Sequence, residues 1–550
     1  MALQALWAEL RPSLAALAAL SFFINLLYLV PAIFMLQVFD RVIPSGSGDT
    51  LVVLLVGTAI ALGLLAALDY VRSRLQHVVG GIFEERLSPE VVSLVVARAA
   101  RRSNGTSNES VRDIAAVRAM FSANGLIALL DAPWVVVFVA VIWLFHPALG
   151  LAAAAAAAVM LIIAWLNDRA SRKQLESLQG EGRRASSYLE SSLRNAEVLQ
   201  ALGMTRGLLE RWRNLQERIA LMQDGASCAN AGFSAATRCV RQAVQILMLA
   251  LGAWLVLGQD ASAGVMIATT ILLGRAVQPV EQLVASWRVL TDARAAFARL
   301  SDLLKNSVKQ NRVALPRPQG RVTVEGLAYR APGGEAPILY NVNLALAPGE
   351  ALAIVGPSAA GKSTLARLLT GVWAPSAGAV RLDGVDVAYW AREELGPWIG
   401  YVPQDVELFD GTVAENIARL GTVDATAVVA AAKRAQAHDM ILALAQGYDT
   451  PIGPLLSPGQ RQRIALARAL YGQPCLVVLD EPNSNLDGAG ELALAQAMLA
   501  LRNEGVTTIV ITHRPSLLQH AHKVLVLANG RVQEYGPAAQ LIKAVMRAAA

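Results

Sequence analysis

The sequence predicts a multi-domain membrane protein, with a domain of six long apolar helices followed by an α/β domain. Hydrophobic residues make up 55% of the 550 residues, more than an ordinary soluble protein carries, and they are concentrated in the first half. In the second half, short apolar runs of strand length alternate with helix-compatible segments. A glycine-rich loop joins one of these strands to the segment that follows it. This alternation is typical of a parallel sheet with helices on both faces.

Six apolar segments of the first half have the composition of membrane-spanning helices. They are Ser13–Leu36, Leu51–Leu68, Gly125–Phe145, Leu149–Leu166, Gln242–Gly258 and Gly264–Gly274. The last segment is short for a hydrocarbon core of about 30 Å. We therefore expect its helix to continue past Arg275.

The charges between these segments predict their orientation. Residues 72–124 contain eight lysines and arginines and residues 167–237 contain ten, whereas the turns at 146–148 and 259–263 contain none. By the positive-inside rule, both termini, the two long connections and the second domain face the cytoplasm, as expected of a multi-pass membrane protein. The long connections are helix-compatible, so we expect them to extend the membrane helices well beyond the bilayer.

The net charge of +6 is unevenly distributed along the chain. Residues 1–320 hold 30 basic and 22 acidic residues, whereas the remainder holds 18 basic and 20 acidic. Membrane orientation accounts for the positive charge of the first half. The sequence does not contain a basic run interleaved with aromatic residues, the pattern that would indicate nucleic-acid binding. The three cysteines, Cys228, Cys239 and Cys475, lack the spacing of a metal site and are expected to be free thiols.

The domain boundary is predicted within residues 304–320, where a polar segment leads into Pro316-Arg317-Pro318. The membrane domain then covers residues 1–303 and the α/β domain residues 321–550. In the α/β domain we expect a first helix at Ser363–Thr370 and strands at Val322–Val324, Ile338–Leu346, Ala351–Val355, Ile399–Val402, Leu476–Leu479 and Thr508–Ile511.

The glycine-rich loop has the G-x-x-x-x-G-K-[ST] pattern of a phosphate-binding loop, with a strand before it and a helix after it. Its residues are Gly356, Pro357, Ser358, Ala359, Ala360, Gly361, Lys362 and Ser363, and Thr364 follows. Backbone N–H groups at the helix N-terminus can cradle phosphate oxygens. Lys362 would reach the outer phosphates and Ser363 would bind Mg²⁺. The alternative is a purely structural glycine turn.

A later apolar strand ends in Asp480 and Glu481. Together with the phosphate-binding loop, these acids predict a nucleoside triphosphate and a metal ion as ligands. Four further elements occur in order along the chain. Before these acids come Gln404, which follows a strand, and Leu456–Arg463, which opens an amphipathic helix. After them come Ser484–Asp487 and His513, which closes a strand. With these elements the chain resembles an ABC half-transporter of the exporter type, with one membrane domain and one nucleotide-binding domain.

The resemblance implies a role for each matching residue. ATP would be held by residues 356–364, with Mg²⁺ placed by Ser363, Asp480 and Gln404. Glu481 would polarise the attacking water, and His513 would bridge that water and the γ-phosphate. Gln404 would sense the metal ion and the γ-phosphate. Each ATP would also contact the other subunit of a dimer through Ser457, Gly459, Gln460 and Asp487. For Asp487, a solvated loop acid is the alternative.

Two departures from the family pattern concern the signature and the adenine site. Pro458 stands where exporters usually have glycine, and Pro454-Leu455 replaces a glycine-rich lead-in. The aromatic residue that stacks on adenine would fall near Ala331. Tyr329 could take that role or could be an ordinary strand aromatic. The segment Ser457–Gln460 reads as a helix start, with serine as N-cap and proline in the first helical position.

The membrane domain resembles the inner-membrane ATPase of type I secretion systems, nearest to the protease-secreting branch. This resemblance rests on Phe39–Ser45, Leu130–Trp134, Gly264–Ala268 and Gly274–Gln282, and on the loops 356–363 and 483–487. It implies a homodimer or a partner half, a membrane-fusion protein, an outer-membrane channel and a secreted polypeptide substrate. Arg275, Gln278 and Gln282 share one helical face and would line the translocation path or join helices.

Two other functions remain open. A lipid or drug exporter would share every nucleotide motif. A membrane scaffold or regulator with weak ATPase activity is suggested by the altered signature.

Overall fold

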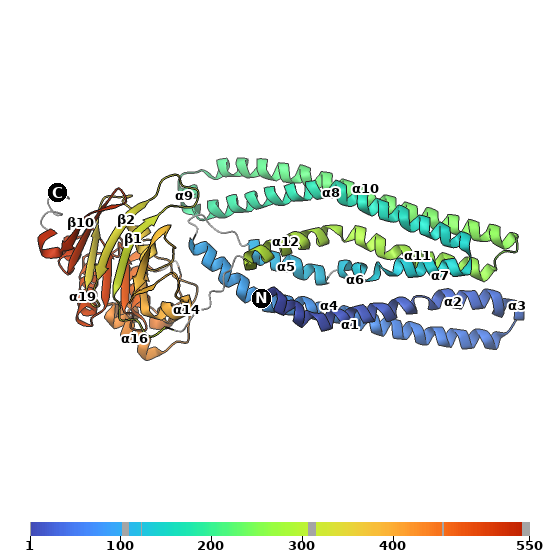
Figure 1. Ribbon diagram of the computed structural model, residues 1–550, viewed down its shortest axis with the longest axis horizontal. Helices are drawn as coiled ribbons and strands as arrows, with labels where there is room; N and C mark the ends of the chain where they lie inside the picture. Colours follow the sequence, from blue (N-terminus) through green and yellow to red (C-terminus); the bar gives the residue numbers. More distant parts are fainter. Residues whose placement is uncertain (1, 102–108, 123, 306–314, 454–455, 542–550) are drawn as a thin grey trace. The chain divides into compact units, whose positions relative to one another are not determined.

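The computed structural model describes residues 2–101, 109–122, 124–305, 315–453 and 456–541 (Figure 1). The chain divides into two compact units, residues 1–308 and 309–550, and this division falls within the predicted linker. The membrane unit and the α/β unit each have their own hydrophobic core.

Long helices dominate the membrane unit. α4 runs without interruption over 54 residues, which corresponds to about 80 Å at 1.5 Å per residue. α8 and α10 are of similar length and lie side by side (Figure 1). The prediction that the long connections continue the membrane helices is therefore confirmed. The longer helices of this unit are α1 (Ala2–Leu27), α4 (Gly48–Arg101), α8 (Pro147–Leu193), α10 (Thr205–Leu257), α11 (Ala263–Ala285) and α12 (Trp287–Lys305).

In the described residues, five helical segments are long and apolar enough to span a membrane, and a bent pair of shorter helices could supply a sixth. The five are Leu6–Ser45, Gly48–Arg101, Pro147–Ala170, Ala231–Leu257 and Ala263–Ala285. The predicted third span, residues 125–145, is divided instead. α6 ends at Asp131 and α7 begins at Trp134, because Pro133 between them has no N–H for a continuous helix. The bent pair joins the helices Ser110–Phe121 and Gly125–Asp131 at 47°.

The first and last spans also differ in detail from a straight helix. The first is broken at Tyr28-Leu29 into α1 and α2 (Val30–Gln37), and it continues through a π-helical turn, η1 (Val38–Val42), into α3 (Ile43–Ser45). The last, α11, continues past Arg275 to Ala285, as predicted. The described parts of residues 109–145 form α5 (Glu109–Ser122), α6 (Asn124–Asp131) and α7 (Trp134–Phe145).

The α/β unit contains a six-stranded sheet in the order β10-β9-β3-β8-β7-β6 and a four-stranded antiparallel sheet in the order β2-β1-β4-β5. β9, β3, β8, β7 and β6 are parallel, so their carboxyl ends meet at one edge. The strands of the larger sheet are β3 (Ala351–Val355), β6 (Ile399–Val402), β7 (Leu476–Asp480), β8 (Thr507–Ile511), β9 (Lys523–Ala528) and β10 (Arg531–Pro537). Those of the smaller sheet are β1 (Val322–Tyr329), β2 (Leu339–Leu346), β4 (Ala377–Leu382) and β5 (Val385–Asp386).

Both faces of the central parallel strands are buried. On β7, Val477 and Leu479 pack into one apolar cluster, whereas Leu476 and Val478 pack into the other. This alternation explains why the strands read as continuous apolar runs. The helices of the unit are α13 (Lys362–Leu369), α14 (Arg392–Leu395), α15 (Val413–Ile417), α16 (Ala425–Arg434), α17 (His438–Leu442), α18 (Pro458–Leu470), α19 (Gly488–Asn503) and α20 (Pro515–Leu518).

Candidate functional site

The glycine-rich loop connects β3 to α13, and its path depends on two glycines. Gly356 has φ of 154° and Gly361 has φ of 98°. A Cβ atom on Gly356 would lie 2.0 Å from the carbonyl oxygen of Leu527, and one on Gly361 would lie 2.8 Å from Cδ2 of Leu339. Any larger residue would therefore displace the loop. Ala359 is also left-handed, with φ of 64°, a conformation that costs energy for a residue with a side chain.

Lys362 is the first residue of α13, and its side chain turns back over the loop. Its Nζ donates to the carbonyl oxygens of Gly356, at 2.7 Å, and of Pro357, at 2.9 Å. The side chain is buried, so these bonds compensate part of the cost of removing the ammonium group from water. The remaining residues of the predicted phosphate site, Ser358, Ala360, Ser363 and Thr364, lie on the same loop or in the first turn of α13.

Asp480 ends β7 and approaches this loop. Its carboxylate accepts a hydrogen bond from the side chain of Ser363. Only 1% of the residue is exposed, and its Oδ1 atom is buried without a hydrogen-bond partner. Burial raises the pKa of the Asp480 carboxyl; the Ser363 hydrogen bond acts in the opposite direction, while the neighbouring Glu481 charge adds to the increase. A buried carboxylate oxygen without a partner calls for a cation.

Ser363 and Asp480 supply two oxygen donors. Two donors of this kind suit Mg²⁺ better than a metal ion whose ligands are all protein side chains. Mg²⁺ prefers oxygen ligands and is commonly bound through one or two protein groups together with phosphate oxygens and water. In the described parts of the chain, no group of three or more histidine, cysteine or acidic side chains could form a metal cage. The residues present therefore fit a metal ion that arrives with a phosphate ligand.

Glu481 and Gln404 meet at the carboxyl edge of the sheet. Nε2 of Gln404 donates to Oε2 of Glu481 at 3.0 Å, although the two residues are far apart in the sequence. Glu481 follows β7 and has φ of 48°, a left-handed conformation that is uncommon for glutamate. Its backbone N–H donates to the carbonyl oxygen of Ile511 on β8 at 3.0 Å, which fixes the backbone at this point.

His513 lies at the same edge, just after the end of the neighbouring strand β8. Asp480 pairs with Ile511 across β7 and β8, so the residues that follow each strand leave the sheet side by side. His513 is exposed to solvent. A connection that the sequence did not suggest supports this edge: Oγ1 of Thr512 donates to Oδ1 of Asn483 at 3.1 Å. The loop after Glu481 is thereby attached to the end of β8.

The signature segment forms the start of α18, as predicted. Ser457 is the N-cap, and its hydroxyl accepts from the backbone N–H of Gln460 at 3.2 Å. In return, Oε1 of Gln460 accepts from the N–H of Ser457 at 2.9 Å, which completes a capping box. Pro458 occupies the first helical position. The interpretation of Ser457–Gln460 as a helix start is confirmed, whereas Pro454-Leu455 lies outside the described residues.

Among described residues, the hydrogen bonds of this helix start remain local and do not reach the glycine-rich loop. Gly459 faces the segment after β7, because a Cβ atom there would lie 3.0 Å from the carbonyl oxygen of Asn485. Asp487 is the N-cap of α19, where its Oδ1 accepts from the N–H of Gly490 at 2.8 Å. Its side chain is 73% exposed and lies 3.8 Å from a guanidinium nitrogen of Arg463. Within one chain, Asp487 is thus a helix cap on the surface.

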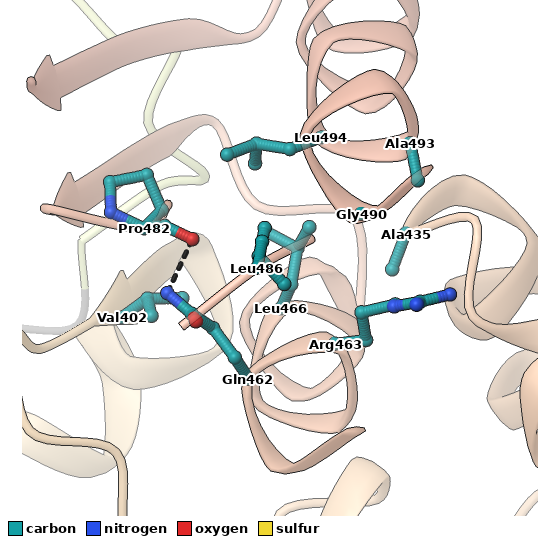
Figure 2. Close-up of a pocket in the computed structure, with 10 residues that line it drawn as sticks. All are labelled: Val402, Ala435, Gln462, Arg463, Leu466, Pro482, Leu486, Gly490, Ala493 and Leu494. Carbon is teal, nitrogen blue, oxygen red and sulfur yellow. Dashed lines mark hydrogen bonds between the residues drawn. The ribbon is translucent and has the colours of Figure 1, made fainter. Parts of the chain in front are cut away.

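Gln462 links α18 to the segment that follows β7 at the carboxyl edge of the sheet, a contact that the sequence did not suggest. Its side chain is 3% exposed and donates to the carbonyl oxygen of Pro482, as Figure 2 shows. Its Oε1 atom accepts from the N–H of Asn485 at 3.3 Å. A small apolar pocket surrounds this bond, with Leu466 and Leu494 among the side chains that line it (Figure 2). These two bonds attach α18 to the backbone that follows Glu481.

Tyr329 is a strand aromatic of the domain core. Only 6% of its surface is exposed, and its ring stacks on Trp373 with centroids 5.0 Å apart. Its burial and its contact with Trp373 favour an ordinary strand aromatic over a residue that stacks on adenine. Burial of the ring raises the pKa of the Tyr329 hydroxyl, while the charge of Arg367 acts in the opposite direction.

Comparison with known proteins agrees with this geometry. The family model "ABC transporter" matches residues 339–484 and the model "ABC transporter transmembrane region" matches residues 14–280. The chain is 40% identical to the type I secretion system ATP-binding protein PrsD of Rhizobium meliloti (strain 1021), over 98% of this chain and 94% of that protein. It is 31% identical to the cyclolysin secretion/processing ATP-binding protein CyaB of Bordetella pertussis, over 96% of this chain and 75% of that protein.

A solved structure of a bacterial Atm1-family ABC exporter with ATP bound is also similar. Its TM-score is 0.82 at 25% identity, and the match covers 98% of this chain and 97% of the other. The similarity thus extends through both units, and the matched segments include the glycine-rich loop, Gln404, the signature and Glu481. The chain belongs to the ABC transporter family and combines one transmembrane region with one ATP-binding domain.

Proposed function

We propose that this protein is the inner-membrane ATPase of a type I secretion system, which uses ATP hydrolysis to export polypeptides across the bacterial envelope. It would act as a homodimer, with its nucleotide-binding domains in the cytoplasm. A periplasmic adaptor of the membrane-fusion type and an outer-membrane channel would complete the conduit. The single observation that carries this proposal is similarity through both units to a type I secretion ATP-binding protein.

Positioning and charge stabilisation would account for most of the ATP chemistry. The amides at the start of α13 and the ammonium group of Lys362 would hold the phosphates. Glu481 would accept a hydrogen bond from the attacking water and orient it toward the γ-phosphate. The 3.0 Å contact with Gln404 supports this role, because it holds the carboxylate at the edge of the sheet. His513, exposed at the end of the next strand, would donate to the γ-phosphate.

Ser363 and Asp480 would hold Mg²⁺, with Gln404 as a further oxygen ligand. The ion would neutralise part of the phosphate charge. The buried, unpartnered Oδ1 atom of Asp480 supports its role as a ligand.

Each ATP-binding site would be completed by residues of the second subunit. Ser457, Gly459 and Gln460 at the start of α18, together with Asp487, would face the γ-phosphate held by the partner. This assignment is consistent with the described hydrogen bonds, in which Ser457 and Gln460 bond to each other and not to the glycine-rich loop.

Replacement of Glu481 by glutamine tests the catalytic part of the proposal. We expect ATP binding to be retained and steady-state hydrolysis to fall by at least about 100-fold, since the substitution keeps the shape but removes the carboxylate. Binding can be followed with a fluorescent ATP analogue and turnover by phosphate release. The matched control is Glu534→Gln, which changes an exposed glutamate of β10. Turnover within about threefold of the wild type, the effect of one weak contact, would exclude Glu481 as the catalytic base.

Substrate class separates export of polypeptides from the alternatives. In proteoliposomes, an unfolded polypeptide with a free carboxyl terminus should stimulate ATP hydrolysis, and a lipid or small drug should not. Stimulation by lipid or drug alone would favour the lipid or drug exporter. Absence of measurable hydrolysis under every condition would favour a scaffold, a function suggested by Pro458 in the signature.

A further inference from the structure

The membrane unit contains a polar cavity of about 220 Å³ among α1, α4, α6 and α11. Polar and charged side chains at membrane depth are costly and are usually retained for a site or a path. The cavity is lined by two carboxylates and two guanidinium groups, from Asp69, Asp131, Arg72 and Arg275. These charges are distributed unequally around it.

One part of the lining is negative. Arg72 is only 4% exposed and bonds to Asp69 at 2.7 Å and to Asp131 at 3.3 Å, so two carboxylates share one guanidinium. Asn25 donates to the other oxygen of Asp131 at 2.7 Å. The side chain of Asp69 is 51% exposed, so its carboxylate remains accessible. This part of the lining can accept hydrogen bonds from N–H groups.

Arg275 on α11 is the cation that balances the negative part of the cavity lining. Its guanidinium lies 4.1 Å from the ring centroid of Tyr28, and one nitrogen donates to Oε1 of Gln278 at 3.1 Å. Among the described residues, no carboxylate lies within ion-pair distance of Arg275. Stacking on the ring and the amide bond fix the plane of the group, and most of its five donors remain available. A fixed guanidinium plane is suited to a two-point bond with a carboxylate.

The backbone of α11 lacks one helical hydrogen bond at this position. Pro279 lies inside the helix and has no N–H, so it cannot donate to the carbonyl oxygen of Arg275 one turn earlier. The amide side chains of Gln278 and Gln282 also line the cavity and can both donate and accept. Amide and carboxylate side chains are partners that the N–H and C=O groups of a peptide backbone can use.

We propose that this cavity binds a short extended segment of the exported polypeptide, with a carboxylate of that segment on Arg275 and its backbone N–H groups facing Asp131 and Asp69. The inference rests on the proposed function, because it assumes a polypeptide substrate. A free anion such as phosphate fits less well, since it would meet the two acids without any N–H group to offer them.

Binding of matched short peptides to the full-length protein in an uncharged detergent tests this site. One dye-labelled peptide carries a single central glutamate and the other carries glutamine, and both have amidated carboxyl ends. We expect the wild type to bind the glutamate peptide about tenfold more tightly, as one charge-assisted hydrogen-bonded contact allows. Arg275→Gln should abolish this preference and keep the affinity for the glutamine peptide. Arg275→Lys should retain part of it.

The control is Arg288→Gln, which removes an exposed arginine of α12 that does not line the cavity and should leave the preference intact. Equal affinity of the wild type for both peptides would overturn the carboxylate site but leave polypeptide export standing. Failure of the wild type to bind either peptide would count against the proposed function itself. A preference that disappears when phosphatidylethanolamine is added would assign the cavity to a lipid headgroup and would also overturn the inference.

Discussion

Two helix N-termini of the α/β unit are predicted to meet phosphate, and they begin in different ways. α13 starts after Gly361, a glycine in the left-handed region, and in the described part of the chain no side chain caps it. α18 starts at Ser457 with a complete capping box and has proline in its first helical position. The first helix thus leaves its N–H groups for a ligand, whereas the second satisfies part of its own.

The difference indicates how each terminus could contribute to a composite site. At α13, several bare N–H groups can surround a phosphate. At α18, the N–H of Gln460 is already bonded to Ser457, and Pro458 has no N–H to offer. The groups that remain there are the proton of the Ser457 hydroxyl and the N–H of Gly459. We therefore expect α13 to bind the nucleotide and α18 to make a smaller, closing contact.

The largest effect should come from testing whether the two termini act in different subunits. Lys362→Ala and Ser457→Arg should each reduce ATP hydrolysis by more than about 100-fold, comparable to loss of a transition-state contact. When the two variants are mixed, part of the activity should return. A mixed dimer has one site with an intact Lys362 and an intact Ser457.

Differently tagged chains, purified through both tags, allow hydrolysis by the mixed dimer alone to be measured. A double variant that carries both substitutions in one chain, paired with wild type, serves as the control, since it leaves neither composite site intact. Full activity of either single variant by itself would contradict the shared site.

A smaller effect is expected from the cap of α18. Ser457→Ala removes both the helix cap and the hydroxyl, and should reduce hydrolysis about tenfold and stability by about 1 kcal/mol. Gln460→Ala removes the reciprocal half of the capping box but keeps the Ser457 hydroxyl and the N–H of Gly459, so stability should fall with less effect on turnover. Ser457→Thr keeps both functions and is the matched control. Thermal unfolding and ATP turnover measured on the same samples would separate the two roles; equal loss of turnover in both alanine variants would show that the cap alone matters.

The sequence predicted the α/β site more completely than the membrane unit. The glycine-rich loop and the ends of β7 and β8 are local patterns, and parallel strands bring their carboxyl ends together. Gln462 escaped notice because a glutamine in an amphipathic helix reads as a surface residue. Its partners, Pro482 and Asn485, come from a separate segment. Contacts of this kind depend on tertiary packing.

In the membrane unit, composition identified the apolar segments but not their interruptions. Pro133 divides the third span, and the break at Tyr28-Leu29 divides the first. Arg72 was counted among the positive charges of a cytoplasmic connection, whereas it is buried and paired with Asp131. A count of charges carries no information about which of them turn inward. The position of Arg275 on a polar face was predicted from helical spacing, but its stacking on Tyr28 was not.

The smallest effect should come from Pro458 itself. The first helical position uses no N–H for the helix, and the fixed φ of proline suits it. The capping box that spans Pro458 is intact, because Ser457 and Gln460 bond to each other. Pro458→Gly should therefore change ATP hydrolysis by less than about tenfold, which corresponds to about 1.4 kcal/mol.

Pro458→Ala is the control that separates the N–H from flexibility, since both variants restore the N–H but only glycine loosens the helix start. An N–H restored at position 458 could donate to the γ-phosphate. In that case ATP hydrolysis by both variants should rise about ten- to more than 100-fold, because a hydrogen bond to a charged group contributes about 1.5–3 kcal/mol. A gain of that size would mean that the wild-type chain is a weakened ATPase. A small change in both would mean that α18 closes on the nucleotide through Ser457 and Gly459, and that proline is one of the residues with which this helix can begin.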